Sequence, residues 1–364
     1  MENFKHEGIR ITASEIGALW NTYMIESLVH HVFTYYLNHV EDQDIKNMLV
    51  ILVNETKDSL QLLESAFKQD NLPVPRGITA EDVSLDAPRL FSDKYYLLYS
   101  KSMARFALAT YSLAYTQSTR RDLRQFFSHY LNRLTIVDQQ LTELLLAKGI
   151  YTRPPAIDVR KQVYFVQDKK FFSGFSGRKR PLTALEITYL FFNAQSNAIG
   201  KSLISGFSQV AQSKELKRYF SKGKDIAAKF IEQFNKILVA EEISIVPSFD
   251  SEVMNCTQSP FSDRLMLFHA NFLNSGGFGS YGLAFSSSPR FDLGLLYMKI
   301  LLQVGFYSKE GANLLIKNGW MEHPPSLPDR HAQPMYRKNS LIPQPAKKAV
   351  KKDDVTSNDK HSKE

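Results

Sequence analysis

ITASEI, at residues 11–16, returns as LTALEI at residues 182–187, which is 171 positions later. FSDK at residues 91–94 returns as FSDR at residues 261–264, at an offset of 170. Repeats that stack into solenoids run to only about 20–50 residues, so a unit of this length is a whole domain. The sequence therefore predicts two copies of one domain in tandem.

Each copy contains four segments in which apolar residues recur at helical spacing. The middle two segments of the first copy are separated by residues 71–91, where Pro73, Pro75, Gly77 and Pro88 exclude a continuous helix. The other breaks are short. We expect helices in the first copy around residues 19–36, over 44–68 and 94–115, and up to about 148; in the second copy we expect them over 183–211, 214–238, 262–287 and 290–318.

Short loops make antiparallel neighbours, whereas a crossover of about twenty residues lets the third helix begin at the far end of the bundle. One long crossover defines the ferritin-like version of a four-helix bundle. We therefore predict an all-α chain of two tandem ferritin-like bundles, each with a long crossover between helices 2 and 3. The predicted parts are repeat 1 at 10–149, a basic and aromatic connector at 150–181, repeat 2 at 182–325, and a disordered basic tail at 331–364.

The chain has 364 residues and a formal net charge of +8, and the basic residues are unevenly placed. Residues 153–180 hold eight Lys/Arg against two Asp, and residues 331–364 hold eight against four acidic residues. Cys256 is the single cysteine, which excludes intramolecular disulfides and cysteine-based zinc sites. The first residues lack the apolar core of a secretory signal, so we expect a cytoplasmic protein.

Three further motifs carry a family resemblance: APRLFSD at residues 87–93, GFSQVA at residues 206–211 and GWMEHPP at residues 319–325. Together they make residues 10–330 resemble domain-of-unknown-function family 3231, which occurs in spore-forming bacteria, often as two copies in one chain. The resemblance implies a ferritin-like helical bundle and kinship with spore coat protein F. It implies no activity, substrate or catalytic residue.

Ferritin-like bundles raise the hypothesis of a di-iron site, which needs Glu-x-x-His pairs on two helices. No such pair occurs in this chain, and the nearest approach is Glu26 with His30. Their counterparts in the second copy are Asn197 and Lys201, which would not preserve the site. We expect no metal and no cofactor.

Gly277, Gly279 and Gly282 match the spacing of a dinucleotide-binding fingerprint. That fingerprint requires a strand before it and a helix after it, but here it falls inside a predicted helix. The counterparts in the first copy are also small residues, which favours close helix packing or a local cavity over nucleotide binding.

Charged residues recur near the predicted helix starts, and they could cap helices or build a buried polar site. Capping explains both copies without a ligand and is the favoured interpretation. These residues are Arg89, Asp93, Arg120 and Asp122 in the first copy, and Asp263, Arg290 and Asp292 in the second.

The connector interleaves basic and aromatic residues from Arg160 to Arg180, a composition that suits single-stranded nucleic acid or another anionic polymer. The alternative is that the aromatic side chains pack between the bundles while the charges face water. We favour this packing, so nucleic acid is not the expected partner.

The sequence nominates no catalytic, cofactor-binding or metal-binding residue, and Cys256 has no adjacent base. We therefore expect a non-enzymatic structural or interaction protein of a spore-forming bacterium. Its expected partners are proteins, spore coat components among them, and its expected cytoplasmic location includes the mother cell, with the spore coat as an alternative. Two alternatives stay open: a ferritin-like metal-binding protein or oxidoreductase, and a small-molecule or lipid-binding bundle with its pocket at the glycine-rich third helix of repeat 2.

Overall fold

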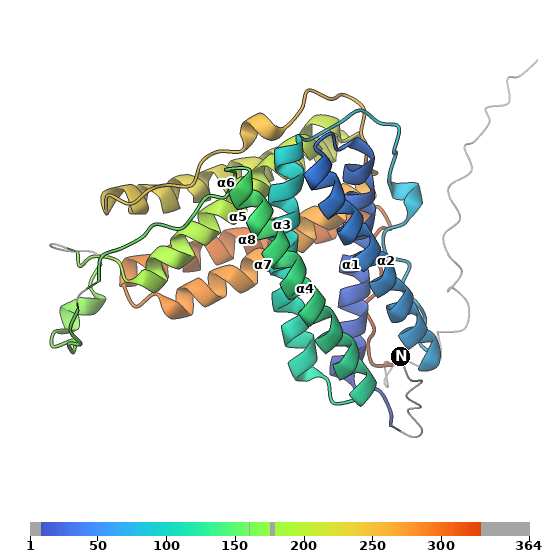
Figure 1. The fold of residues 1–364 in the computed structure, drawn as a ribbon, viewed down its shortest axis with the longest axis horizontal. Helices are drawn as coiled ribbons and strands as arrows, with labels where there is room; N and C mark the ends of the chain where they lie inside the picture. Colours follow the sequence, from blue (N-terminus) through green and yellow to red (C-terminus); the bar gives the residue numbers. More distant parts are fainter. Residues whose placement is uncertain (1–8, 160, 175–178, 329–364) are drawn as a thin grey trace, which may run out of the picture. The chain divides into compact units, whose positions relative to one another are not determined.

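The computed structural model describes residues 9–159, 161–174 and 179–328, so the predicted tail at 331–364 lies outside the described residues. The described part is all-helical, in two halves of four α-helices each, as predicted (Figure 1). Repeat 1 contains α1 (Ala13–His39), α2 (Gln43–Gln69), η1 (Ala80–Asp82), α3 (Asp93–Gln117) and α4 (Arg121–Ala147). The connector contains η2 (Lys169–Phe172); repeat 2 contains α5 (Ala184–Val210), α6 (Lys214–Ala240), η3 (Asp250–Glu252), α7 (Asp263–Ser287) and α8 (Phe291–Lys317).

The repeated ITASEI and LTALEI motifs are helix starts. The Thr12 side-chain oxygen accepts the Glu15 N–H at 3.3 Å, and the Glu15 carboxylate accepts the Thr12 N–H at 2.8 Å. Thr183 and Glu186 form the same reciprocal pair at the start of α5. This capping box satisfies backbone donors that a helix start would otherwise leave unpaired. The motif is therefore repeated because both bundles begin in the same way.

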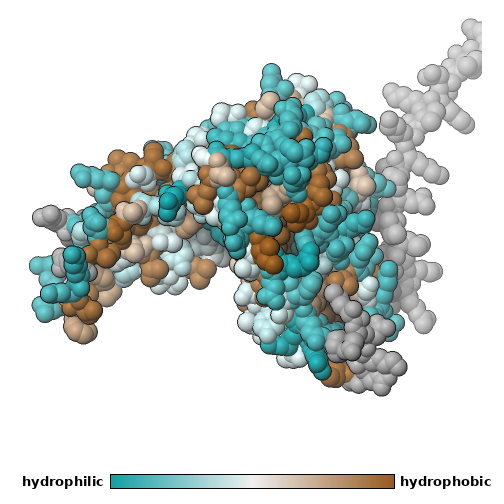
Figure 2. Space-filling model, viewed as in Figure 1, coloured by the Kyte–Doolittle hydropathy of each residue, from teal (hydrophilic) through white to brown (hydrophobic). Residues whose placement is uncertain are grey.

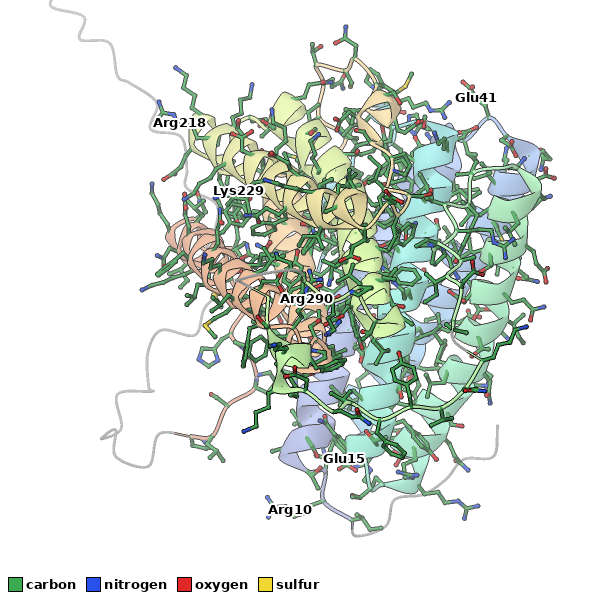
Figure 3. The ribbon with its side chains drawn as sticks, turned by 90° about the vertical axis from the view of Figure 1, so that its left-hand side faces the viewer. Arg10, Glu15, Glu41, Arg218, Lys229 and Arg290 are labelled. Atoms are coloured by element: carbon green, nitrogen blue, oxygen red, sulfur yellow. The ribbon has the colours of Figure 1, made fainter. Side chains whose placement is uncertain are left out.

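In each repeat, the long crossover returns the chain to the end at which the first hairpin turns. The Asp93 carboxylate, at the start of α3, accepts the backbone N–H of Asp42 at 2.7 Å in the α1–α2 turn. At the opposite end, Glu15 accepts the backbone N–H of Arg120 at 2.7 Å in the α3–α4 turn. Figure 3 labels Glu15 and Glu41 at these two ends of repeat 1. Helix α3 is thus antiparallel to α1, as the ferritin-like topology requires.

The two crossovers hold the repeats together, because the crossover of each repeat contacts the start of the third helix of the other repeat in the same way. Asp82 of the first crossover accepts hydrogen bonds from Ser262 Oγ at 2.6 Å and from Arg264 at 2.6 Å. Glu252 of the second crossover accepts from Ser92 Oγ at 2.5 Å, and Lys94 completes the same pattern at 2.9 Å. Each member of one set lies 170 positions from its counterpart in the other. The repeats therefore form an internal pseudo-dimer.

The apolar core runs through the contact between the repeats. Tyr99 of α3 and His269 of α7 occupy equivalent positions in the two repeats. Their side chains are buried and share a hydrogen bond of 2.9 Å between the Tyr99 hydroxyl and His269 Nε2. Residues up to Pro325 consequently form one compact unit. Among the described helices, none combines the length and hydropathy that a membrane crossing would need.

Candidate functional site

The recurring arginines at the bundle ends are buried in ion networks. Arg120 pairs with Asp70 at 2.5 Å and with Asp122 at 2.8 Å, and its side chain is 1% exposed. Arg290 pairs in the same way with Glu241 at 3.1 Å and with Asp292 at 2.8 Å. These networks tie the end of the second helix to the start of the fourth, so they have a structural role.

Asp93 and Asp263 do not cap their own helices, which corrects our interpretation of them. Ser92 and Ser262 provide those caps. The Asp93 carboxylate instead reaches the turn before α2 and pairs with Arg89, while the Asp263 carboxylate accepts the Ser213 N–H at 3.0 Å before α6. Each aspartate therefore stabilises the neighbouring hairpin turn.

Glu26 and His30 point to different partners and do not form a ligand pair. The Tyr111 hydroxyl donates to Glu26 at 2.6 Å, and His30 Nδ1 lies 2.9 Å from Thr56 Oγ1. Burial raises the pKa of Glu26 to about 7, against the opposing effect of the Tyr111 hydrogen bond. In the part of the chain that the structure describes, no group of three or more His, Cys, Asp or Glu side chains could hold a metal ion.

The connector does not pack its central aromatic residues between the bundles, so that expectation is wrong. Tyr164 and Phe165 are 64% and 85% exposed. The connector is anchored at its two ends: Ile150 and Tyr151 pack against the core, and the Arg180 guanidinium lies 4.2 Å from the centre of the Phe171 ring and pairs with the buried Glu186 at 2.8 Å. In Figure 2, brown hydrophobic residues are exposed at the far left, where Figure 1 shows the connector.

Helix α8 exposes an apolar face, which is absent from its counterpart α4. Five residues at steps of three and four along α8 are 42–73% exposed: Phe291, Leu295, Met298, Leu302 and Phe306. Their counterparts 170 positions earlier are Arg121, Gln125, Ser128, Asn132 and Ile136. Four of the five positions are thus polar in repeat 1 and apolar in repeat 2.

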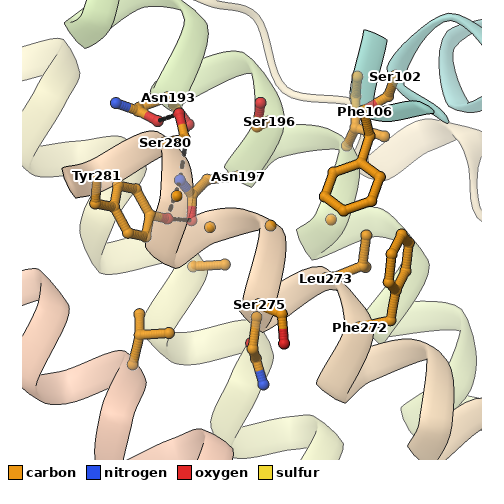
Figure 4. A pocket seen from close by; sticks show the side chains of 18 of the residues that line it. Ser102, Phe106, Asn193, Ser196, Asn197, Phe272, Leu273, Ser275, Ser280 and Tyr281 are labelled. Atoms are coloured by element: carbon orange, nitrogen blue, oxygen red, sulfur yellow. Dashed lines mark hydrogen bonds between the residues drawn. The ribbon is translucent and has the colours of Figure 1, made fainter. Parts of the chain in front are cut away.

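A cavity of about 840 Å³ lies where helices of both repeats meet. Helix α3 of repeat 1 forms one wall, and α5, α6, α7 and α8 of repeat 2 form the others. Apolar walls come from Phe106, Phe272 and Leu273, which appear together in Figure 4. The equivalent Leu113 and Leu283 are 59% and 60% exposed at its edge, so the cavity opens to solvent there.

Small residues in repeat 2 create this space. Gly276, Gly277 and Gly279 line the cavity on α7, and a Cβ added at Gly279 would meet no atom within 4 Å. Gly276 is closely packed, because an added Cβ there would lie 2.7 Å from the Phe106 ring. Of the three fingerprint-like glycines, Gly277 and Gly279 line the cavity and Gly282 does not, so the motif lies within a helix that forms one wall of the cavity. Ligand binding by the cavity stays a proposal.

The cavity holds a few polar groups, most of which are hydrogen-bonded to one another, while the amide nitrogens of Asn193 and Asn274 are buried without a partner. Ser280 donates to Asn193 Oδ1 at 2.6 Å, and the Asn197 amide and Tyr281 hydroxyl exchange hydrogen bonds at 2.8 and 3.1 Å (Figure 4). Arg105 donates to Ser196 Oγ at 2.6 Å across the α3–α5 boundary. No Asp, Glu, His, Cys or Lys is among the described residues that line the cavity.

Sequence reasoning missed both Arg105 and the α8 face. Arg105 is a lone charge within the apolar run from Met103 to Leu108, and its counterpart Ser275 shows that only repeat 1 carries it. The α8 face repeats at helical spacing and could have been found by comparing each position with its counterpart on α4.

Comparisons with known proteins agree with the internal repeat. A family model described as "Protein of unknown function (DUF3231)" matches residues 1–163 and again residues 170–332. No curated protein matches the chain. Among solved structures, a Bacillus halodurans protein described as a "putative spore coat protein" is similar at 19% identity with a TM-score of 0.38, over 42% of this chain and 98% of that one. A likeness that low supports no inference about function.

Proposed function

The chain belongs to the DUF3231 family, and from that premise we propose that it is a non-enzymatic interaction protein of a spore-forming bacterium. The observation that supports this proposal best is the exposed apolar face of α8, defined by Phe291, Leu295, Met298, Leu302 and Phe306. Contiguous apolar surface on a folded protein commonly marks an interaction site. The absence of acidic, imidazole and thiol groups from the described cavity lining supports a non-enzymatic role.

The surroundings of the α8 face favour an acidic partner. A groove of about 620 Å³ lies between α6 and α8, with Phe306 and Ile226 in it. Three cations and one carboxylate surround it, and one of the cations is already paired with Glu310 at 2.5 Å: Arg218, Lys222 (the paired one), Lys229 and Asp225. Arg218 and Lys229, labelled in Figure 3, have no ion-pair partner among the described residues. An amphipathic helix with acidic residues would cover the apolar face and pair with these cations. A second copy of this chain would bring like charges together.

The proposed location follows from the sequence resemblance. The resemblance implies kinship with spore coat protein F, and on that ground we propose that the partner is a protein of the mother cell or the spore coat. The structural role would then be attachment to a coat component through the apolar face of α8.

The test replaces residues of the α8 face with their repeat 1 counterparts. We expect the tagged wild-type protein to fractionate with spore layers and to resist extraction by salt. The triple variant Leu295→Gln, Met298→Ser, Leu302→Asn should appear in the soluble fraction, because it loses the apolar contact. Cross-linking from position 298 should capture an acidic helical segment.

A matched control removes exposed apolar residues from α4 of repeat 1 instead, through Ile136→Asn and Leu146→Asn. This control should behave as the wild type. Retention of the triple variant in salt-washed spore layers would contradict the proposal. A dimer in light scattering that the triple variant abolishes would identify a second copy as the occupant and would also overturn it.

A further inference from the structure

Arg105 is a cation in the wall of an apolar cavity, and no carboxylate neutralises it. Among the described residues none places a carboxylate oxygen within 4 Å of its guanidinium. Asp138, which acts on Arg105 electrostatically without contacting it, is paired with Lys101 at 2.5 Å. Arg105 is thus unlike Arg120 and Arg290, each of which holds two acidic side chains.

The contacts of Arg105 leave most of its donors unused. Nη2 donates to Ser196 Oγ at 2.6 Å, and the guanidinium carbon lies 5.2 Å from the centre of the Phe192 ring. A guanidinium has five N–H donors, so four have no acceptor in the described part of the chain. Burial lowers the pKa of Arg105, which reflects an environment that disfavours an unpaired cation.

We propose that the cavity binds an elongated apolar molecule with a single anionic head group, and that this head group pairs with Arg105. A carboxylate or phosphate can accept two parallel N–H bonds from a guanidinium, and such bonds are stronger in an apolar environment. The apolar part would lie against Phe106, Phe272 and Ile226. Fatty acids and phosphorylated lipids share this chemistry.

The size and position of the cavity fit such a ligand. Pockets that hold small molecules have volumes of about 300–1,000 Å³, and this one has about 840 Å³. Asn197 and Tyr281 already satisfy each other, whereas the buried amide nitrogens of Asn193 and Asn274 have no acceptor and remain free for an oxygen atom of a ligand. These amides are neutral. Arg105 is the charged group among the described residues of the lining, so it selects the charge of the head group. This inference is independent of the α8 face.

The experiment compares an acid with the alcohol of the same chain length. The full chain is loaded with the neutral fluorescent probe N-phenyl-1-naphthylamine, which dodecanoate, dodecyl phosphate or dodecanol then displaces. We expect dodecanoate to bind about tenfold or more tightly than dodecanol, which corresponds to about 1.4 kcal/mol. A stronger response to dodecyl phosphate would identify a phosphorylated lipid rather than a fatty acid as the better ligand.

Four variants separate the contribution of Arg105 to head-group recognition from the contribution of the cavity volume to binding. Arg105→Met should abolish the preference for the anion while dodecanol binding stays unchanged, and Arg76→Met, which removes an exposed arginine, should preserve the preference. Gly279→Leu should exclude every ligand, because its side chain would enter the cavity. Gly282→Leu, on the same helix but outside the lining, should bind as the wild type does.

Equal affinity of the wild type for dodecanoate and dodecanol would overturn the inference without any variant. Persistence of the anion preference in Arg105→Met would do the same. Failure of every probe and ligand to bind would overturn it together with the cavity as a binding site, but it would leave the α8 proposal intact.

Discussion

Both repeats place a tyrosine at the same point of the third helix, but the surroundings of that tyrosine differ. In repeat 1 the Tyr111 hydroxyl contacts the buried carboxyl of Glu26 and the Ser59 hydroxyl, beside a space of only about 50 Å³. In repeat 2 Tyr281 contacts the neutral amide of Asn197 at the wall of the 840 Å³ cavity. The same scaffold therefore supports one closed core and one open core.

The difference arises from a few side-chain volumes. Val29 of α1 corresponds to Gly200 of α5, and Ala109 of α3 corresponds to Gly279 of α7; both glycines line the cavity, and an added Cβ at either would meet no atom within 4 Å. Removing buried methylene groups leaves a cavity when neighbouring elements cannot collapse into it. Here the reciprocal contacts of Asp82 and Glu252 fix the repeats against each other, so the space persists. Contacts with repeat 1 therefore help to keep the cavity beside repeat 2 open.

The largest expected effect distinguishes the buried ion networks of the two repeats. Arg120→Met should lower the free energy of unfolding by about 3–5 kcal/mol, because it removes a buried guanidinium that joins two acidic side chains. Arg290→Met should cost less, because the pair of Arg290 with Glu241, at 3.1 Å, is longer than the pair of Arg120 with Asp70, at 2.5 Å. Urea unfolding at neutral pH measures both. Equal losses would show that the networks are energetically equivalent.

The second prediction concerns Glu26, whose pKa is raised to about 7 from an ordinary value of 4.5. Between these values the folded state binds the extra proton, so the free energy of unfolding falls as pH rises from about 4.5 to 7. Glu26→Gln, which mimics the amide of repeat 2, should match the wild type near pH 4. At pH 8 it should be more stable by about 3 kcal/mol.

The matching change in the other repeat is Asn197→Asp, which introduces a carboxyl beside Tyr281. It should make repeat 2 lose stability as pH rises, in the way that repeat 1 does. Thermal melts of the two variants and the wild type at pH 4, 6 and 8 would show both trends. A Glu26→Gln difference that does not depend on pH would contradict the pKa assignment.

The fold was predictable because its signals are local. Thr12 and Glu15 mark a helix start by their spacing alone, and Pro73, Pro75 and Pro88 exclude a helix from the crossover. The duplicated motifs then place the second bundle. These patterns depend on backbone hydrogen bonding within a few residues, which a sequence displays directly.

The cavity and the α8 face depend on contacts between distant residues, so periodicity did not locate them. The sequence alone does not distinguish a helical glycine that packs against a neighbour, as Gly276 does against Phe106, from one that faces an open space, as Gly279 does. The prediction that the connector packs between the bundles was wrong for a related reason. Aromatic residues are usually buried, but the Phe165 side chain is 85% exposed.

The last and smallest effects test the glycines of the open repeat. In a helix interior, alanine is more favourable than glycine by about 1 kcal/mol when space permits. At Gly223 space does not permit it, because an added Cβ would lie 2.1 Å from the Tyr307 hydroxyl, and the Tyr307 ring stacks on Tyr219 at 4.3 Å. Gly223→Ala should therefore destabilise the protein, by about 1–3 kcal/mol, as overpacked core substitutions do.

Gly279→Ala should have the opposite sign. Its added methyl group meets no atom within 4 Å, so the gain in helix propensity is unopposed and should stabilise the protein by up to about 1 kcal/mol. A change from glycine to alanine thus reports the free volume around each position, because the difference in helix propensity between the two residues is the same at both. Urea unfolding of both variants measures the difference. Destabilisation by Gly279→Ala would mean that α7 closes over the cavity in solution, and the contrast between the open and closed repeats would then be lost.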